Sequence, residues 1–417
     1  MPTLSRRGFI KGVAIGSGLT IGGIMIQYLR ALAQTGEMDP RSFVPLVRKD
    51  DTTPTVSPTA TPTHTATPSP TTSPRGARVV HVRSASATDW DFGDDWYGDH
   101  VDQTAVNRMV DEGLTRLTGT TSRADAWGAL LPNFQIGQRV AIKVNFNNCL
   151  SEGCAGNAID ALIEPVNSVI RGLVERGVAA TDIWVYDVTH AWHDGRIPPR
   201  FIAGCDFTGI HFAAYVGEVN PYSATEKVHF NTPPGGPAIQ DLPLCNVLVD
   251  AHYLINMPIV KSHPFTGVTL GFKNHFGSFD RCDYTHVYTP GCPPTIYSCD
   301  YDSNYSPLID IYLNSHIRDK TILTMGDCLF GAWSDPTWKP TPWVTFGYSA
   351  PNSLFFARDP VAIECVMTDV LAAETNLLPA TDDYLRLAGE AELGTYERGD
   401  PWGGGYGQIE YVQVEIP

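Results

Sequence analysis

The segment from Leu254 to Asp280 holds the residues best suited to chemistry. It reads LINMPIVKSHPFTGVTLGFKNHFGSFD and places two lysines and two histidines among apolar residues and glycines, in a chain of net charge −16. Burying a lysine costs free energy unless its amine meets an anion, and burial lowers the pKa of that amine. We therefore expect this segment to form a site that binds an anionic group.

Lys261 and His263 stand at the end of an apolar run that predicts a β-strand. Pro264 disfavours a helical conformation of the preceding residue, so His263 should be extended, with its imidazole fixed in direction. Thr266 and Gly267 are suited to open a helix whose first amides bind an anion. A capping role alone would explain Thr266, but not the lysine and the histidine.

A helix over Gly267–Phe276 would carry Lys273 nearly two turns beyond its start, with Asn274 next to it. Neighbouring residues of a helix do not share a face, so His275 would point elsewhere. We expect Lys273 and Asn274 to contact the ligand, and His275 to be a packing or surface residue.

Hydrophobic patterning after residue 75 predicts the elements that must position these residues. The predicted strands are Arg78–Arg83, Arg139–Asn145, Asp182–Asp187, Ile210–Val216, Asn246–Asn256 and Lys320–Gly326. The predicted helices are Gln103–Leu117, Pro165–Arg176, Gly267–Phe276, Pro307–Ile317 and Asp359–Leu371. This alternation indicates an α/β fold with a mainly parallel, mixed sheet, helices on both faces and a C-terminal edge strand near Gln408–Glu415.

Ligands of open α/β sheets bind beyond the carboxyl ends of the strands. Four predicted strand ends carry polar residues: Lys143, Asn145 and Asn147; Asp187, His190, His193 and Asp194; Lys261 and His263; and Asp327. We expect these ends to line one crevice. Lys143 would bind an anionic group there, or act as a base if desolvated. The alternative is a lysine whose stem lies along the sheet while its amine reaches water.

Asp187, His190 and His193 also form a candidate metal site. Imidazole and carboxylate groups at this spacing suit zinc or a similar ion. A polar loop without metal is the alternative, and the sequence leaves the cofactor open.

The chain resembles the domain-of-unknown-function 362 (DUF362) family in four motifs. They are VAIKVNFN at 140–147, the segment 254–280, ILTMGDCLFGAW at 322–333 and FFARDPVAIECV at 355–366. The family often reads IKPN, then LPKLKTHxxTGVTxxxKNxFG, then a strand that ends in Asp, then DPVAxD. The resemblance implies a fold and a site but no settled reaction.

The chain departs from the family pattern at three positions. Val144 replaces the usual proline, Ser262 a threonine and Glu364 an aspartate. Glu364 keeps the carboxylate with a longer reach. Many relatives carry a ferredoxin-like cysteine region that this sequence lacks, so we expect no iron–sulfur cluster.

Three functions follow as hypotheses. The first is an enzyme that binds a small anionic ligand and catalyses proton transfer or a redox step on it. Its catalytic residues would be Lys143, Lys261, His263 and Asp327, and its ligand contacts Asn145, Thr266, Gly267, Lys273, Asn274 and Glu364. Either Asp327 or Glu364 would hold a lysine or an ion, whereas Asp359, before Pro360, reads as a helix cap. The alternatives are a non-catalytic surface binding protein and a metal or metallocofactor protein.

The N-terminal region predicts export. Paired arginines before Phe9 and Ile10, a glycine-rich apolar run and the small residues of ALA at 31–33 are typical of a twin-arginine signal over residues 1–33. An uncleaved membrane anchor is the alternative. Residues 34–75 include an almost pure Thr/Pro/Ser tract, which predicts an extended stalk, and residues 76–417 a globular domain. We expect a periplasmic, cell-surface or extracellular protein that meets the translocation machinery.

Charge and cysteine content bound the partners and the redox state. The acidic balance disfavours nucleic-acid binding, which needs a basic face. Export favours local disulfides in two groups of the nine cysteines, namely Cys149 with Cys154, and Cys282, Cys292 and Cys299. The remaining cysteines, at 205, 245, 328 and 365, lie in apolar surroundings and are expected to be core thiols.

Overall fold

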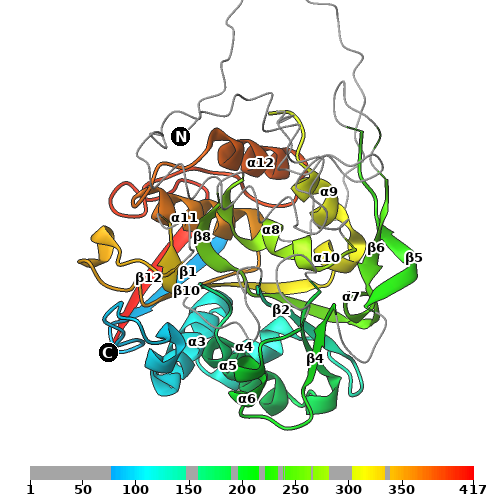
Figure 1. The fold of residues 1–417 in the computed structure, drawn as a ribbon, viewed down its shortest axis with the longest axis horizontal. Helices are drawn as coiled ribbons and strands as arrows, with labels where there is room; N and C mark the ends of the chain where they lie inside the picture. The colour runs from blue at the N-terminus through cyan, green and yellow to red at the C-terminus, as the bar shows by residue number, and fades with distance from the viewer. Residues whose placement is uncertain are drawn as a thin grey trace, which may run out of the picture. The chain divides into compact units, whose positions relative to one another are not determined.

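A mixed sheet of ten strands organises the computed structural model (Figure 1). The structure describes residues 77–146, 158–188, 196–215, 221–232, 238, 240–263, 266–280, 303–333 and 339–417. The main strand order is β12-β1-β11-β10-β7-β2-β3-β4, with β8 paired to β10 and β9 to β8. The strands are β1 (Arg78–Ser84), β2 (Val140–Lys143), β3 (Ile183–Asp187), β4 (His211–Ala214), β7 (Tyr253–Asn256), β8 (Ile259–His263), β9 (Gly267–Thr269), β10 (Thr321–Ala332), β11 (Ser353–Ala357) and β12 (Glu410–Ile416).

The strands from β10 to β4 run parallel to one another, and β11 is antiparallel to both of its neighbours. At the edge, β12 pairs with β1 in parallel. Strands β2 and β11 are buried along their whole length, and β7 is buried except at Tyr253, as expected of central strands covered on both faces. The predicted α/β fold, its mixed sheet and its C-terminal edge strand are confirmed.

Helices cover both faces of the sheet, as Figure 1 shows. One face carries α3 (Gln103–Thr118), α4 (Arg123–Leu130), α5 (Ile163–Arg176) and α6 (Pro199–Ala203). The other carries α8 (Gly271–Asn274), α9 (Pro307–Leu313), α11 (Pro360–Ala372) and α12 (Pro379–Glu390). The smaller elements are α7 (Asn246–Asp250), α10 (Ser315–Arg318), η2 (Tyr97–His100), η4 (Ala180–Asp182), η5 (His275–Gly277), η6 (Val344–Phe346) and the separate antiparallel pair β5 (Tyr222–Val228) and β6 (Leu242–Cys245).

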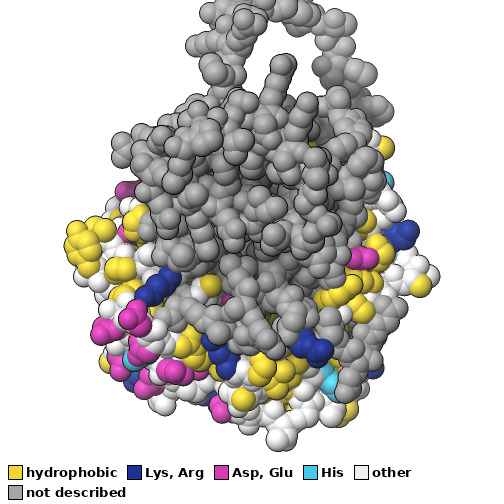
Figure 2. Space-filling model, in the orientation of Figure 1, with side chains coloured by type: hydrophobic (Ala, Val, Ile, Leu, Met, Phe, Trp, Pro, Cys, Tyr) yellow, Lys and Arg dark blue, Asp and Glu magenta, His cyan; other side chains and the backbone are white. Residues whose placement is uncertain are grey.

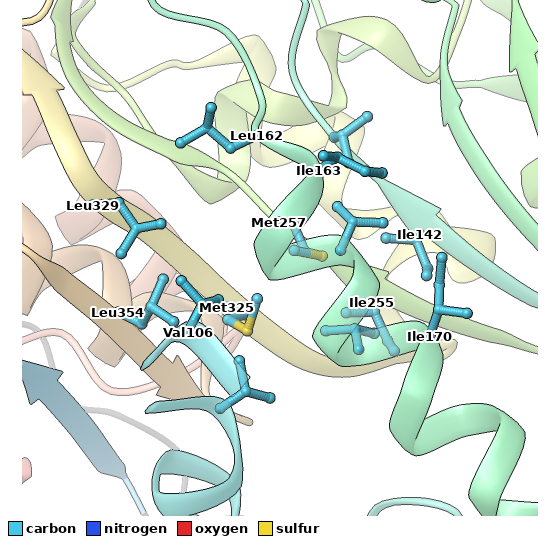
Figure 3. Close-up of a cluster of buried hydrophobic side chains, with 14 of the residues drawn as sticks. Val106, Ile142, Leu162, Ile163, Ile170, Ile255, Met257, Met325, Leu329 and Leu354 are labelled. Carbon is cyan, nitrogen blue, oxygen red and sulfur yellow. The ribbon is translucent and has the colours of Figure 1, made fainter. Parts of the chain in front are cut away.

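Side-chain alternation along the strands divides the core into two clusters, one on each face. We call them the α5 face and the α11 face after the helices that cover them. Figure 3 shows part of the α5-face cluster, to which Ile163 of α5 and Ile142 of β2 both belong. The residues next to such positions, for example Ala141 in β2, belong to the α11-face cluster. Successive residues of a strand therefore point to opposite faces of the sheet and contact different helices.

Four predicted elements were wrong in part. The helix expected over Pro307–Ile317 is divided at Asn314 into α9 and α10. The helix expected over Gly267–Phe276 is strand β9, then the single turn of α8 and the 3₁₀ turn η5. The strand expected over Asn246–Asn256 begins as helix α7 and becomes β7 only at Tyr253. The strand expected to end at Gly326 continues to Ala332.

Acidic side chains gather on one part of the surface, at the lower left of Figure 2. Exposed aspartates occur in the segment that leads into α3, at positions 89, 91, 94, 95 and 99. Within the described part of the chain, no helix has the length and apolar character required to cross a bilayer.

Candidate functional site

The sheet divides the predicted site residues between its two faces. Lys143 pairs in register with Asn256. Both lie on the α11 face, because Ala141 and Leu254, two positions earlier in their strands, belong to the core of that face. Lys261 and Asp327 lie on the α5 face, because Ile259 and Leu329, two positions away in each strand, belong to the core of that face. The strands therefore bring the candidates to one region of the sheet but not to one crevice on one face.

On the α11 face, the amine of Lys143 is fully buried among polar partners. Its Nζ lies 3.4 Å from Oδ1 of Asp187, donates to Oδ1 of Asn274 at 3.2 Å and donates to the carbonyl of Val144. Both side chains of the Lys143–Asp187 pair are 1% exposed. A buried lysine with an anion and two acceptors is the arrangement that offsets desolvation. The structure does not place this amine in water, which was the alternative for Lys143.

Asn274 connects this lysine to the neighbouring strands. Its Oδ1 also accepts from Nδ2 of Asn145 at 3.3 Å, and its Nδ2 donates to Oδ1 of Asn256 at 2.8 Å and to the carbonyl of Lys143 at 3.3 Å. Nδ2 of Asn256 in turn donates to the carbonyl of Gly271 at the start of α8. Such a buried amide network fixes α8 against the ends of β2 and β7.

Asp187 is engaged by protein groups on both carboxylate oxygens. Oδ1 faces Lys143, and Oδ2 accepts the backbone N–H of Phe146 at 2.8 Å. His190 and His193, the other residues of the proposed metal site, lie outside the described residues, as do Asn147 and Asp194. Among the described residues, no group of three or more His, Cys, Asp and Glu side chains could hold a metal ion. The metal site stays a prediction.

On the α5 face, Lys261 is buried with 0% exposure. Burial lowers the pKa of its amine from 10.5 to about 8, and the nearby carboxylate of Asp160 partly opposes this shift. At neutral pH such an amine is close enough to its pKa to give or take a proton.

Asp327 lies inside β10 rather than after a strand, which corrects the predicted position. Its Oδ1 accepts the N–H of Leu329 at 3.0 Å. The register between β10 and β8 shifts beyond this residue, between Asp327 and Ala332. Burial raises the pKa of the carboxyl group from 3.8 to about 7.

Sequence reasoning missed three residues around this pair. Glu164, in the first turn of α5, has a pKa raised to about 7, mainly by burial, with the charge of Asp327 contributing. Tyr97 is 1% exposed, and its hydroxyl accepts from the N–H of Asp160 at 2.8 Å and donates to its carbonyl at 3.1 Å. The signal was available in DALIEP at 160–165, where two acids stand among apolar residues just before a helix.

Glu364 binds the start of α8, four residues beyond the helix start that was expected at Gly267. Its Oε2 accepts the N–H of Phe272 at 2.9 Å, and its Oε1 accepts from the hydroxyl of Tyr384 at 2.5 Å. Burial raises the pKa of this carboxyl group to about 8, and the hydrogen bonds from Tyr384, Phe272 and Gly271 oppose the shift. Glu364 therefore links α8 to α11 and α12 through these hydrogen bonds. Its expected role, shared with Asp327, of holding a lysine or an ion stays a prediction.

The remaining predicted contacts lie around β9. Gly267 pairs with His263, and Nδ1 of His263 accepts the N–H of Thr266 at 3.4 Å. The amine of Lys273 lies 5.0 Å from the centre of the Phe276 ring. All five of these residues are buried.

Three other predictions concern His275, Asp359 and the cysteines. His275 was expected to be a packing or a surface residue. It is a packing residue, fully buried against Tyr312. Asp359 is a helix cap, because its Oδ1 accepts the N–H groups of Val361 and Ala362. Among the described cysteines, those at 245, 328 and 365 are buried free thiols and Cys205 is a half-buried one, while the cysteines expected to form disulfides lie outside the described residues.

Fold and site together define an α/β protein with buried ionisable groups on both faces of a mixed sheet. Residues 140–369 match the model of the domain of unknown function DUF362, and the chain belongs to this family. No curated protein matches the chain significantly.

The fold also has a distant similarity to a solved structure, the lactate racemase apoprotein from Thermoanaerobacterium thermosaccharolyticum. The identity is 12%, the TM-score is 0.41, and the match covers 73% of this chain and 59% of the racemase chain. At this level of similarity, nothing about activity transfers.

Proposed function

We propose that this DUF362 protein is an enzyme that binds a small anionic molecule on the α5 face of its sheet and moves a proton on it. One observation carries the proposal. Lys261 and Asp327 lie buried on the same face of two paired strands, and burial brings their pKa values toward neutrality from opposite sides, to about 8 and about 7. Groups tuned in this way are the usual partners of acid–base catalysis.

Ligand charge would separate the two roles. An anion beside Lys261 favours the charged ammonium and raises its pKa, so the lysine would bind the ligand as a cation or donate its proton. Asp327, whose charge also acts on Glu164, would then be the base. Proton transfer is favoured over a redox step because these groups supply an acid and a base without any further component.

A deuterium-exchange experiment tests the proposal. The full chain is incubated in D₂O with small carboxylates that carry a C–H bond beside the carboxylate, and exchange is followed by NMR. We expect wild-type protein to exchange at least one of them, and Lys261→Met and Asp327→Asn to lose about 100-fold or more of the rate. Lys227→Met, at an exposed position of β5, is the matched control and should exchange normally.

The contrary results are equally defined. Wild-type protein that exchanges no compound, yet retains a ligand in native mass spectrometry, would reject catalysis in favour of a binding protein. An exchange rate that survives both substitutions would reject this site.

We also propose export by the twin-arginine route, supported by the N-terminal pattern alone. Replacing Arg6 and Arg7 with lysine should leave the protein in the cytoplasmic fraction, whereas the wild type should reach the cell exterior or periplasm. Equal export of both forms would contradict this proposal.

A further inference from the structure

Thr269 lies directly opposite Lys261. The antiparallel register of β8 and β9 pairs Lys261 with Thr269, Ser262 with Val268 and His263 with Gly267. Side chains that face each other across two antiparallel strands share a face and lie about 5 Å apart at their Cβ atoms. Val268 belongs to the α11-face core, so Thr269 points to the α5 face together with the lysine.

The hydroxyl group of Thr269 is buried and has no hydrogen-bond partner among the described residues. The whole residue is only 3% exposed. Leaving a buried hydroxyl without a partner is unfavourable, so this one calls for an explanation. Thr266, three residues earlier and 4% exposed, shows the ordinary arrangement, because its hydroxyl donates to the carbonyl of Val268 at 2.8 Å.

The position of β9 is firmly set by its neighbours. The hydroxyl of Thr381 in α12 donates to the carbonyl of Thr266 at 3.0 Å, and Glu364 holds the N–H of Phe272 just beyond the other end of the strand. With both ends held by helices, the Thr269 hydroxyl cannot turn to a new partner by a small shift of the strand.

We propose that Thr269 is a ligand-binding residue, and that its hydroxyl and the Lys261 ammonium together hold one carboxylate group of a singly charged small molecule. The inference rests on the proposed function for the location of the site and adds the class of ligand. A carboxylate offers two oxygens, one for each of these donors. Asp160, Glu164 and Asp327 border the same region, and their negative charge would repel a dianion such as phosphate more strongly than a monoanion.

Two matched threonine-to-valine substitutions test this inference, because valine has nearly the same shape and replaces the hydroxyl with a methyl group. In the ligand-free full chain, Thr269→Val should have an unfolding temperature equal to or above that of the wild type. Thr266→Val should lower it, since that change removes a hydrogen bond and leaves a buried carbonyl with one partner fewer. If Thr269→Val lowers the unfolding temperature as much as Thr266→Val, the hydroxyl has a structural partner and the inference is overturned.

The binding arm uses acetate, propanoate, glycolate and pyruvate as probes, with phosphate and sulfate as comparison anions, in calorimetric titrations. We expect at least one carboxylate to bind wild-type protein more tightly than phosphate or sulfate. Thr269→Val should raise its Kd about tenfold. Thr321→Val, which removes a buried hydroxyl that donates to the carbonyl of Ile317 at 2.6 Å and lies outside the site, should leave the Kd within about twofold. Absence of carboxylate binding, binding of phosphate at equal strength, or an unchanged Kd in Thr269→Val would each overturn the inference.

These outcomes separate the two proposals. Carboxylate binding that depends on Thr269, without any proton exchange in D₂O, would keep this inference and reject catalysis. Proton exchange that is unaffected in Thr269→Val, with an unchanged Kd, would keep catalysis and reject the role of Thr269.

Discussion

The two faces of the sheet bury a lysine in different ways. On the α11 face, Lys143 has a carboxylate at 3.4 Å and two further oxygen acceptors. On the α5 face, desolvation is the largest influence on Lys261 and lowers its pKa to about 8, with Asp160 opposing it. Both side chains are excluded from solvent, so burial alone does not identify a functional lysine. The difference lies in how far the neighbouring groups offset the desolvation of the charged amine.

This contrast predicts opposite responses to the same substitution, and this is the largest effect we expect. Lys143→Met leaves Asp187 as a buried anion without its cation, which should lower the free energy of unfolding by about 3–5 kcal/mol. Lys261→Met removes an amine that is costly to bury, and should cost at least about 2 kcal/mol less than Lys143→Met. Denaturation by urea at pH 7 measures both values, and equal losses would remove the distinction between the faces.

A second prediction concerns the strand that presents the α5-face site. Gly267 has φ +77°, and a Cβ atom there would lie 1.8 Å from the Thr381 hydroxyl oxygen. Gly267→Ala should therefore cost about 3 kcal/mol through strain and overpacking. It should also disturb Lys261, whose strand pairs with β9.

Gly128 is the matched control, because it lies in helix α4 with nothing within 4 Å of an added Cβ. Gly128→Ala should stabilise the protein by about 0.5–1 kcal/mol. If the two alanine variants unfold alike, β9 does not have the tight packing that fixes the site.

The sequence predicted the α/β fold and the clustering of polar residues near strand ends, because the hydrophobic pattern and the positions of β2 and β3 can be read from short segments of the chain. It could not assign faces. Strands buried on both sides are apolar at nearly every position. They therefore lack an apolar–polar alternation from which the face of a given residue could be predicted. For this reason Lys143 and Lys261 were expected in one crevice, and the pairing of Asp187 with Lys143 was not predicted.

The error at Gly267–Phe276 has a different origin. The segment has a helix-compatible pattern, yet Gly267, Val268 and Thr269 form a strand because β8 offers an edge and α12 holds Thr266 from the other side. Tertiary contacts of this kind override local preference. The carboxylates of Asp160 and Glu164 were visible in the sequence, but only the fold shows that they border Asp327 and Lys261.

The smallest effect we expect tests the electrostatics of the α5 face through pH. The pKa of Asp327 is raised in the folded protein, to about 7 from 3.8, so the folded state binds this proton more tightly than the unfolded state. The stabilisation from this proton is complete below pH 3.8 and disappears as the pH rises through 7. Asn carries no such proton but keeps an oxygen to accept the N–H of Leu329. The stability of Asp327→Asn relative to wild type should therefore increase by about 2 kcal/mol between pH 5 and pH 7.

Two controls belong to this measurement. Glu164 and Glu364 titrate in both proteins, so the difference in stability isolates Asp327, except for the part of the Glu164 pKa shift that Asp327 itself causes. Asp319→Asn, at an exposed position, should show no comparable trend. If the stability difference between Asp327→Asn and wild type does not change with pH, the Asp327 carboxyl group has its ordinary pKa in the folded protein. The α5 face would then lack the base that proton transfer requires.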